Sequence, residues 1–183
     1  MNNKLIIGFI ILCIMSGLYF LNLNNQKNYS SSTTELTTIE QDEIKKILIQ
    51  AQGEAIELIR IDTTWSITGH DTLTIKKQPL ISFFDKVLNL KLETVMTKKE
   101  EKWGTFNIDD SSGTHLALVD FNDNTISYFV FGRSNSDYAR CYVRRNTSSD
   151  VYLASENVMF NFQTRPEYWG EKISETIEGP PVE

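Results

Sequence analysis

THLALVDFNDNTISYFVFGRSNSDYARCYVRR, residues 114–145, is the stretch that decides the fold. It contains three runs rich in β-branched and aromatic residues, at 114–121, 125–132 and 138–145, and each run is a strand candidate. The connectors NDN and RSNSD between the runs have the length and composition of hairpin turns. A fourth candidate, DVYLAS at 150–155, follows after another polar connector. The stretch therefore predicts consecutive antiparallel strands.

The residues before this stretch predict a second group of strands. Apolar residues alternate with charged or polar ones in 53–62 and again in 62–69, which is typical of strands with one buried face. The segment 44–52 fits either a helical face or a strand face. Turn residues separate the three segments, so we interpret 44–69 as a three-stranded antiparallel meander.

KQPLISFFDKVLNLKLE, residues 77–93, predicts the principal helix. Pro79 suits the first helical position. The apolar residues with i, i+3, i+4, i+7 and i+8 spacing are Leu80, Phe83, Phe84, Val87 and Leu88. We expect this apolar face to cover a sheet, because an amphipathic helix must bury its apolar stripe against another element.

The remaining segments complete the fold class. A charged connection with interspersed glycines spans 97–113, and a short C-terminal helix is expected to begin near residue 156. The predicted fold is α+β: a mainly antiparallel β-sheet of meanders and hairpins, with one principal amphipathic helix packed on it and an N-terminal transmembrane helix.

LIIGFIILCIMSGLYFLNL, residues 5–23, contains no charged residue. A helix of this length spans roughly 28 Å, close to the hydrocarbon thickness of a bilayer. A cleaved signal peptide is the alternative, but its apolar region is usually about 7–15 residues long and is followed by a small-residue cleavage motif. We predict a single-pass membrane anchor, with residues 1–4 in the cytoplasm and the globular domain outside it, in the periplasm if the cell is Gram-negative.

The rest of the chain divides at composition changes. Residues 24–43 are rich in Asn, Ser and Thr and predict a polar tether. Residues 44–173 form the expected domain, and residues 174–183 a disordered acidic tail. Of the two cysteines, Cys13 lies in the anchor and Cys141 in the domain, so no disulfide between them is expected.

The composition argues against several classes of function. A net charge of −6 disfavours binding to nucleic acid, which is a polyanion. Nothing in the sequence brings His70 or His115 to Cys141, so no catalytic triad is expected. CxxC, HxxxH and HExxH motifs are absent, and the D-x-N-x-N spacing of 120–124 lacks the glycine and the bidentate glutamate of a calcium loop. We expect no enzymatic activity, no metal and no cofactor.

Four of the six arginines lie between residues 131 and 145. In a strand over 138–145, alternate side chains would share an exposed face, while Cys141 and Val143 would point into the core. The candidate residues of that face and of the connector before it are Arg133, Tyr138, Arg140, Tyr142 and Arg144. Three interpretations stay open: a structural ladder paired with carboxylates, a partner-docking face, or an anion-binding site.

The order of short motifs along the chain resembles the DUF4340 family of uncharacterised bacterial domains. The resemblance covers about residues 44–173. Its motifs are W-x-I at 65–67, LNLKLETV at 88–95, KWGTFNID at 102–109, FVFGR at 129–133, YVRR at 142–145, VYLAS at 151–155 and RPEYWGEKI at 165–173. Members of this family typically carry an N-terminal membrane segment, and some are associated with ABC-type transport systems or with gliding-motility auxiliary proteins.

The resemblance implies an accessory protein of the cell envelope and supplies no active residues. We therefore expect a non-enzymatic, membrane-anchored interaction subunit of a transporter-like or motility-type system, with an envelope or transporter protein as its partner. The alternative is a module that binds an anion or another small ligand through Arg140 and Arg144.

Overall fold

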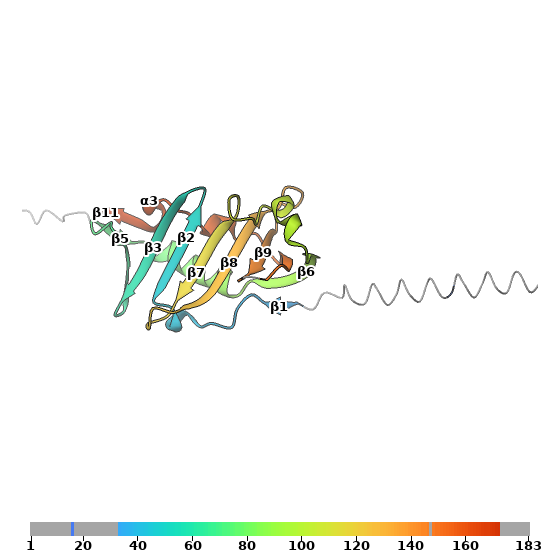
Figure 1. Cartoon of the computed structure of the whole chain (residues 1–183). Helices are drawn as coiled ribbons and strands as arrows, with labels where there is room; N and C mark the ends of the chain where they lie inside the picture. The colour runs from blue at the N-terminus through green and yellow to red at the C-terminus, as the bar shows by residue number, and fades with distance from the viewer. Residues whose placement is uncertain (1–15, 17–32, 147, 173–183) are drawn as a thin grey trace, which may run out of the picture. The chain divides into compact units, whose positions relative to one another are not determined.

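The computed structural model describes residues 33–146 and 148–172, together with residue 16 (Figure 1). Apart from residue 16, the predicted anchor at 5–23 lies outside the described residues, and so does the predicted tail at 174–183. In the part of the chain that is described, no helix combines the length and the apolar character needed to cross a bilayer.

A nine-stranded antiparallel sheet forms the body of the domain, in the order β1-β6-β10-β9-β8-β7-β2-β3-β4. Residues 114–145 supply the centre of this sheet. This stretch forms β7 (Thr114–Val119), β8 (Thr125–Arg133) and β9 (Cys141–Arg145), and the fourth candidate forms β10 (Val151–Ala154). Each of these strands pairs with the next. Four consecutive strands are therefore confirmed, although β9 begins at Cys141 instead of residue 138.

The predicted meander is confirmed as β2 (Lys46–Ala51), β3 (Glu54–Ile61) and β4 (Thr64–Ile67). It joins the central strands because β2 pairs with β7. The side chains of Ile47 and Ile49 point into the core, so the strand periodicity of this ambiguous segment prevails over its helical one.

The principal helix is shorter than predicted. It is α-helical in α2 (Lys77–Phe83) and continues as a π-helical turn, η2 (Phe84–Leu88). Pro79 is the third helical residue instead of the first. The expected last turn belongs to another strand, β6 (Lys91–Thr97), which is rich in β-branched residues and pairs with β10.

The domain begins earlier than residue 44, so the predicted tether over 24–43 is wrong for its last part. Strand β1 (Thr34–Glu35) pairs with β6, and Leu36 is buried in the main core. A short 3₁₀ turn, η1 (Gln41–Glu43), follows with a capping box between Glu40 and Glu43. The polar composition of this segment predicts a tether. The burial of one leucine, Leu36, and the pairing of β1 with β6 nevertheless hold the segment against the sheet.

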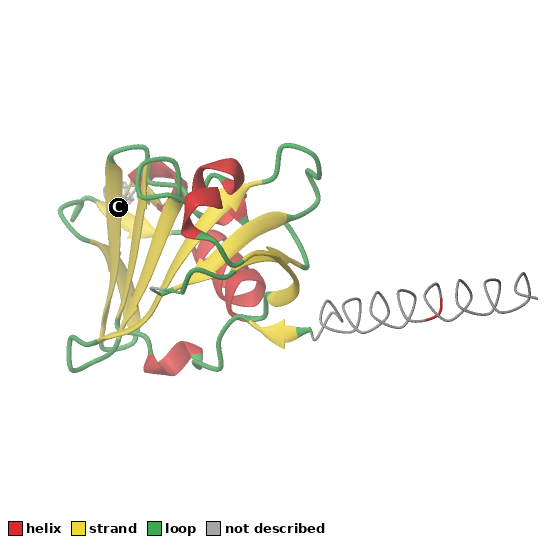
Figure 2. Cartoon of the chain, turned by 45° about the vertical axis from the view of Figure 1, so that its right-hand side comes forward, coloured by secondary structure: helices red, strands yellow, loops and turns green. Residues whose placement is uncertain are grey.

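The principal helix, with the short C-terminal helical turns, covers one face of the sheet (Figure 2), and the main core lies between these helices and the sheet. The apolar side of the principal helix faces the core as predicted, with Phe83 and Val87 fully buried. The expected C-terminal helix is instead a 3₁₀ turn, η4 (Met159–Asn161), followed by the four-residue α3 (Pro166–Trp169). A separate two-stranded antiparallel sheet is formed by β5 (Leu73–Ile75) and β11 (Gly170–Lys172), and β11 directly follows α3.

Candidate functional site

Only half of the sheet's outer face, the face opposite the helices, is covered. The connection predicted as a charged loop contains η3 (Glu100–Phe106), and it packs on the outer side of β8, β9 and β10. A second core forms there around Ile108, Val130, Tyr142 and Val151, with Trp103 and Phe106 packed against it. We call the residues 100–113 the cover, because they turn this half of the outer face into a buried interface.

The cover approaches the sheet most closely at Gly132. A Cβ atom at this position would overlap the Phe106 carbonyl oxygen, and it would lie 2.7 Å from both the Asn107 carbonyl oxygen and Ile108 Cγ2. Only glycine leaves room for the backbone of the cover at this distance. The glycine of the FVFGR motif therefore has a packing role.

The predicted exposed face of arginines and tyrosines is wrong for Tyr142 and Arg144. Their exposed fractions are 8% and 4%, because the cover lies on the outer side of β9. Tyr138 is 83% exposed, but it lies in the turn before the strand. The prediction that Cys141 and Val143 point into the core is confirmed.

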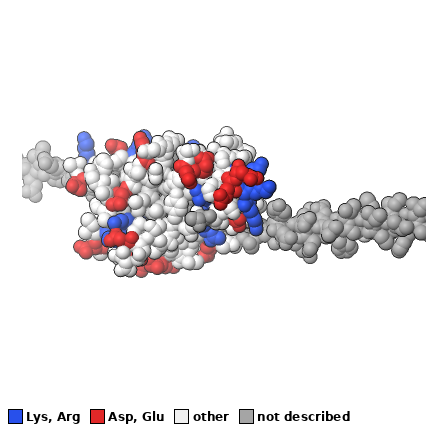
Figure 3. Space-filling view, in the orientation of Figure 1, with Lys and Arg blue, Asp and Glu red and all other residues white. Residues whose placement is uncertain are grey.

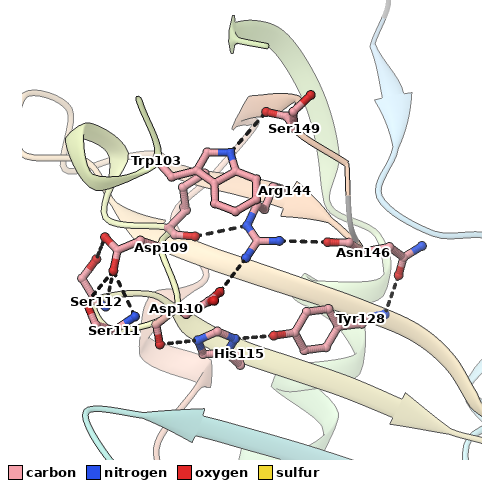
Figure 4. A network of polar contacts seen from close by, with 11 residues as sticks. Trp103, Asp109, Asp110, Ser111, Ser112, His115, Tyr128, Arg144, Asn146 and Ser149 are labelled. Carbon is pink, nitrogen blue, oxygen red and sulfur yellow. Dashed lines mark hydrogen bonds and ion pairs between the residues drawn. The ribbon is translucent and has the colours of Figure 1, made fainter. Parts of the chain in front are cut away.

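Arg144 is the polar centre of the covered half, and Figure 4 shows its contacts. Its Nε donates to the Ile108 carbonyl oxygen at 3.1 Å, and Nη1 donates to the Asn146 carbonyl oxygen at 2.9 Å. Nη2 forms an ion pair with Asp110 Oδ1 at 3.2 Å. The guanidinium carbon also lies 4.0 Å from the centre of the Trp103 ring. All three guanidinium nitrogens are engaged, so Arg144 fastens the cover to the sheet.

The other predicted site residues do not converge on Arg144. Arg140 pairs through Nε with Asp137 at 2.6 Å and through Nη1 with Glu93 at 3.1 Å. The hydrogen bonds that Arg140 donates, first to Asp137 and then to Glu93, raise the pKa of its guanidinium. Arg133 is exposed at the end of β8. The structural interpretation of these arginines therefore fits their contacts better than a shared binding face.

Strand register places His115 beside the Arg144 network, which sequence reasoning missed. His115 lies opposite Val130 of β8, and Val130 lies opposite Arg144 of β9, so the three residues form one cross-strand row. The Nδ1 atom of His115 hydrogen-bonds the Tyr128 hydroxyl, and Nε2 contacts the Asp110 carbonyl oxygen at 3.3 Å. The pKa of the Tyr128 hydroxyl is raised, and burial is the largest cause. The positive charge of Arg144 opposes this shift, and the negative charge of Asp110 adds to it. This pair marks the border of the covered half.

Beyond this border the outer face is open to solvent. We call it the open half, and its outward-facing residues on β2, β3 and β7 include Lys46, Leu48, Gln50, Ala55, Glu57, Ile59, His115 and Ala117. A cavity of about 410 Å³ lies on it, with Leu48 and Ala117 among its apolar lining and Glu57, His115 and Tyr128 among its polar lining. Figure 3 shows mostly uncharged surface over the middle of the sheet.

Two aspartates in the connecting segments, Asp120 and Asp109, have local roles. Asp120 Oδ1 accepts hydrogen bonds from the amides of Asn122 and Asn124, so the hairpin turn predicted there is confirmed. Asp109 accepts hydrogen bonds from both hydroxyls of Ser111 and Ser112, which strongly lower the pKa of its carboxyl. Among the described residues, no group of three or more His, Cys, Asp or Glu side chains could hold a metal ion.

Comparison with known proteins gives one match. A family model described as "Domain of unknown function (DUF4340)" matches residues 65–178, more than half of the 183-residue chain. The match starts at Trp65, so it excludes β2 and β3, which the expected range of 44–173 included. No curated protein and no solved structure matches.

Proposed function

The chain belongs to the DUF4340 family, and from this premise we propose that it is a non-enzymatic accessory protein that binds a protein partner through the open half. The observation that carries the proposal is the composition of this exposed sheet face. The solvated side of an antiparallel sheet is normally polar, whereas Leu48, Ile59 and Ala117 point outward here.

The charge of the open half also favours a protein partner. The charged residues among those named, Lys46 and Glu57, have opposite signs, and Glu57 is the one Asp, Glu, Lys or Arg side chain in the lining of the cavity. The cores of protein interfaces are depleted of charge and contain pockets for anchor residues of the partner. This pattern is a better fit to a protein surface than to a polyanion.

The covered half supports the proposal by fixing one rim of the open half. His115 and Tyr128 line the cavity and are held by the Arg144 network, so the rim is formed before any partner arrives. A preformed surface loses less conformational entropy on binding than a mobile one.

The expected membrane anchor gives the proposal its setting. With residues 5–23 in the bilayer and the domain outside the cytoplasm, the partner would be a membrane or envelope protein, such as a component of a transporter-like or motility-type system. The described part of the domain starts at residue 33 instead of 44.

The alternative, an anion site formed by Arg140 and Arg144, has no support from the geometry. Arg144 uses its guanidinium nitrogens within the cover, and Arg140 is paired with two carboxylates. An anion would have to displace these contacts.

Site-specific photocrosslinking in intact cells tests the proposal. A photoreactive amino acid at Gln50, which is exposed on the open half, should give one discrete adduct, whereas the same group at Lys86, exposed on the helical side, should not. Substitution of Ala117 by Arg should abolish the Gln50 adduct without lowering the melting temperature. Adducts of equal yield from both positions, or an adduct unaffected by Ala117→Arg, would contradict docking on this face.

A further inference from the structure

Arg145 lies on the inward side of β9, where the preceding residues of the same side belong to the main core. On β9 the side chains of Cys141 and Val143 are fully buried in the main core, and strand alternation places Arg145 on the same inward face. Arg145 lies opposite Phe129 of β8, which belongs to that core. A charge in such a row is costly unless it is paired or solvated.

Arg145 differs from the neighbouring arginines in the contacts of its guanidinium. Within residues 33–146 and 148–172, no carboxylate forms an ion pair with Arg145, whereas Arg140 and Arg144 both have such partners. The guanidinium of Arg145 instead lies over the ring of Tyr152, with 5.6 Å between its carbon and the ring centre. No buried side-chain nitrogen or oxygen of the described residues lacks a hydrogen-bond partner, so the free nitrogens of Arg145 reach solvent.

The solvent that Arg145 reaches fills a groove of about 1020 Å³. One wall is the N-terminal segment 33–39, and the other is formed by residues of β8, β9 and β10 with the turn after β9. The lining is mixed: Ile126 and Tyr152 offer apolar surface, whereas Ser127 and Ser148 offer hydroxyl groups. One carboxylate, that of Glu35, also lines the groove, but it forms no ion pair with Arg145.

We propose that this groove binds an amphipathic anion, a molecule with a phosphate or carboxylate group beside an apolar chain. The anion pairs with the free edge of the Arg145 guanidinium, whose fork of N–H groups matches two oxygens of such a group. Hydroxyl groups of Ser127 and Ser148 are available for further hydrogen bonds, and the apolar chain lies against Ile126 and the Tyr152 ring. The groove involves none of the residues of the open half, so this inference stands apart from the docking proposal.

The test uses the full chain in a neutral detergent. During titration with hexyl phosphate, NMR follows the backbone amides of Ser127 and Ser148 in every variant and the Nε–Hε resonance of Arg145 in the wild type. We expect a saturable shift, and an affinity about tenfold or more higher for the wild type than for Arg145→Gln, as the loss of a hydrogen bond to a charged group implies. The exposed Arg165 provides the control, because Arg165→Gln should bind like the wild type. Equal affinities of the wild type and Arg145→Gln would overturn the site.

Two further titrations define the ligand. Hexanol and inorganic phosphate should each bind at least about tenfold more weakly than hexyl phosphate, and equal binding of either would overturn an amphipathic anion as the ligand. The source is distinguished in phosphatidylcholine nanodiscs. A shift of the Arg145 resonance on inclusion of phosphatidic acid supports a membrane lipid, whereas a shift only on addition of hexyl phosphate supports a soluble amphiphile.

Discussion

The guanidinium carbon of Arg144 lies 4.0 Å from the centre of the Trp103 ring, and this contact joins two motifs that are far apart in the chain. Arg144 belongs to YVRR on β9, and Trp103 belongs to KWGTFNID in the cover. The glycine of FVFGR lies beneath the same segment. Three of the motifs that carry the family resemblance therefore meet at one interface, and their shared role is to hold the cover on the sheet.

Substitution of Gly132 by Ala should destabilise the domain by about 1–3 kcal/mol, the usual cost of an overpacked site. The added Cβ meets backbone atoms of the cover, which cannot rotate away as a side chain could. Urea denaturation measures the change. Gly104→Ala is the matched control within the cover, because the nearest atom to its Cβ would be Asp109 Oδ2 at 3.7 Å. Equal stability of the wild type and Gly132→Ala would contradict the close approach.

The thiol of Cys141 should be unreactive in the native protein. Burial raises the pKa of this thiol to about 11, so the nucleophilic thiolate is scarce at pH 8. In a Cys13→Ser chain, iodoacetamide should label Cys141 rapidly only after denaturation. Rapid labelling of the native domain would show that the thiol is accessible.

The same raised pKa makes a stability prediction with a defined sign. The folded state holds the Cys141 proton more tightly than the unfolded state, whose thiol titrates near 9. The stabilising contribution is complete below pH 9 and is lost as the pH rises toward 11. The difference in unfolding free energy between the wild type and Cys141→Ala should therefore shrink over this range. A difference that is constant with pH would be inconsistent with the raised pKa.

Asp109 should titrate well below the ordinary range of an aspartate. Hydrogen bonds from the Ser111 and Ser112 side chains, and from their backbone amides, stabilise the ionised form. Because the folded pKa is lowered, the contribution to stability is present above pH 4 and is lost as the pH falls. The carboxyl ¹³C shift should show this low midpoint, and Ser111→Ala with Ser112→Ala should raise it. An ordinary midpoint in the wild type would refute the hydrogen-bonded turn.

The strand pattern of the central sheet could be predicted from the sequence because its signals are local. Alternation in β7, β8 and β9, with polar connectors of hairpin length, does not depend on distant residues. The predicted helix extends to residue 93, because Leu92 continues the helical spacing. Residues 91–93 instead begin β6, and only the pairing of that strand with β10 decides the outcome.

The site could not be predicted because it depends on the cover. The alternation of apolar and polar residues within a strand does not show that another segment lies on its outer side. Tyr142 and Arg144 look like the exposed side of a half-buried strand, and the cover that buries them reads as a charged loop. The missed signal was its spacing of Trp103, Phe106 and Ile108, three large apolar residues within a segment otherwise rich in charge. Arg145 was missed for a related reason, since its inward direction becomes informative only once the groove is known.

Arg144 fastens the cover to the sheet. Substitution by Met retains an apolar stem but removes all three polar contacts, leaving the carbonyl oxygens of Ile108 and Asn146 without this donor. Since Asp110 is 89% exposed, water can solvate its carboxylate, and most of the cost falls on the two carbonyl groups. We expect a loss of about 2–4 kcal/mol. Arg140→Met is the control, because Arg140 pairs at the surface and its removal should change stability little.

Amide hydrogen exchange on the Arg144→Met protein tests this claim most directly, because it reports each segment separately. Exchange should accelerate in residues 103–113 and in the amides of β9 and β10 beneath the cover, while the amides of β2 and β3 keep their protection. Arg140→Met should leave protection of the cover as in the wild type. Unchanged protection of residues 103–113 in Arg144→Met would contradict the claim that this arginine holds the cover on the sheet.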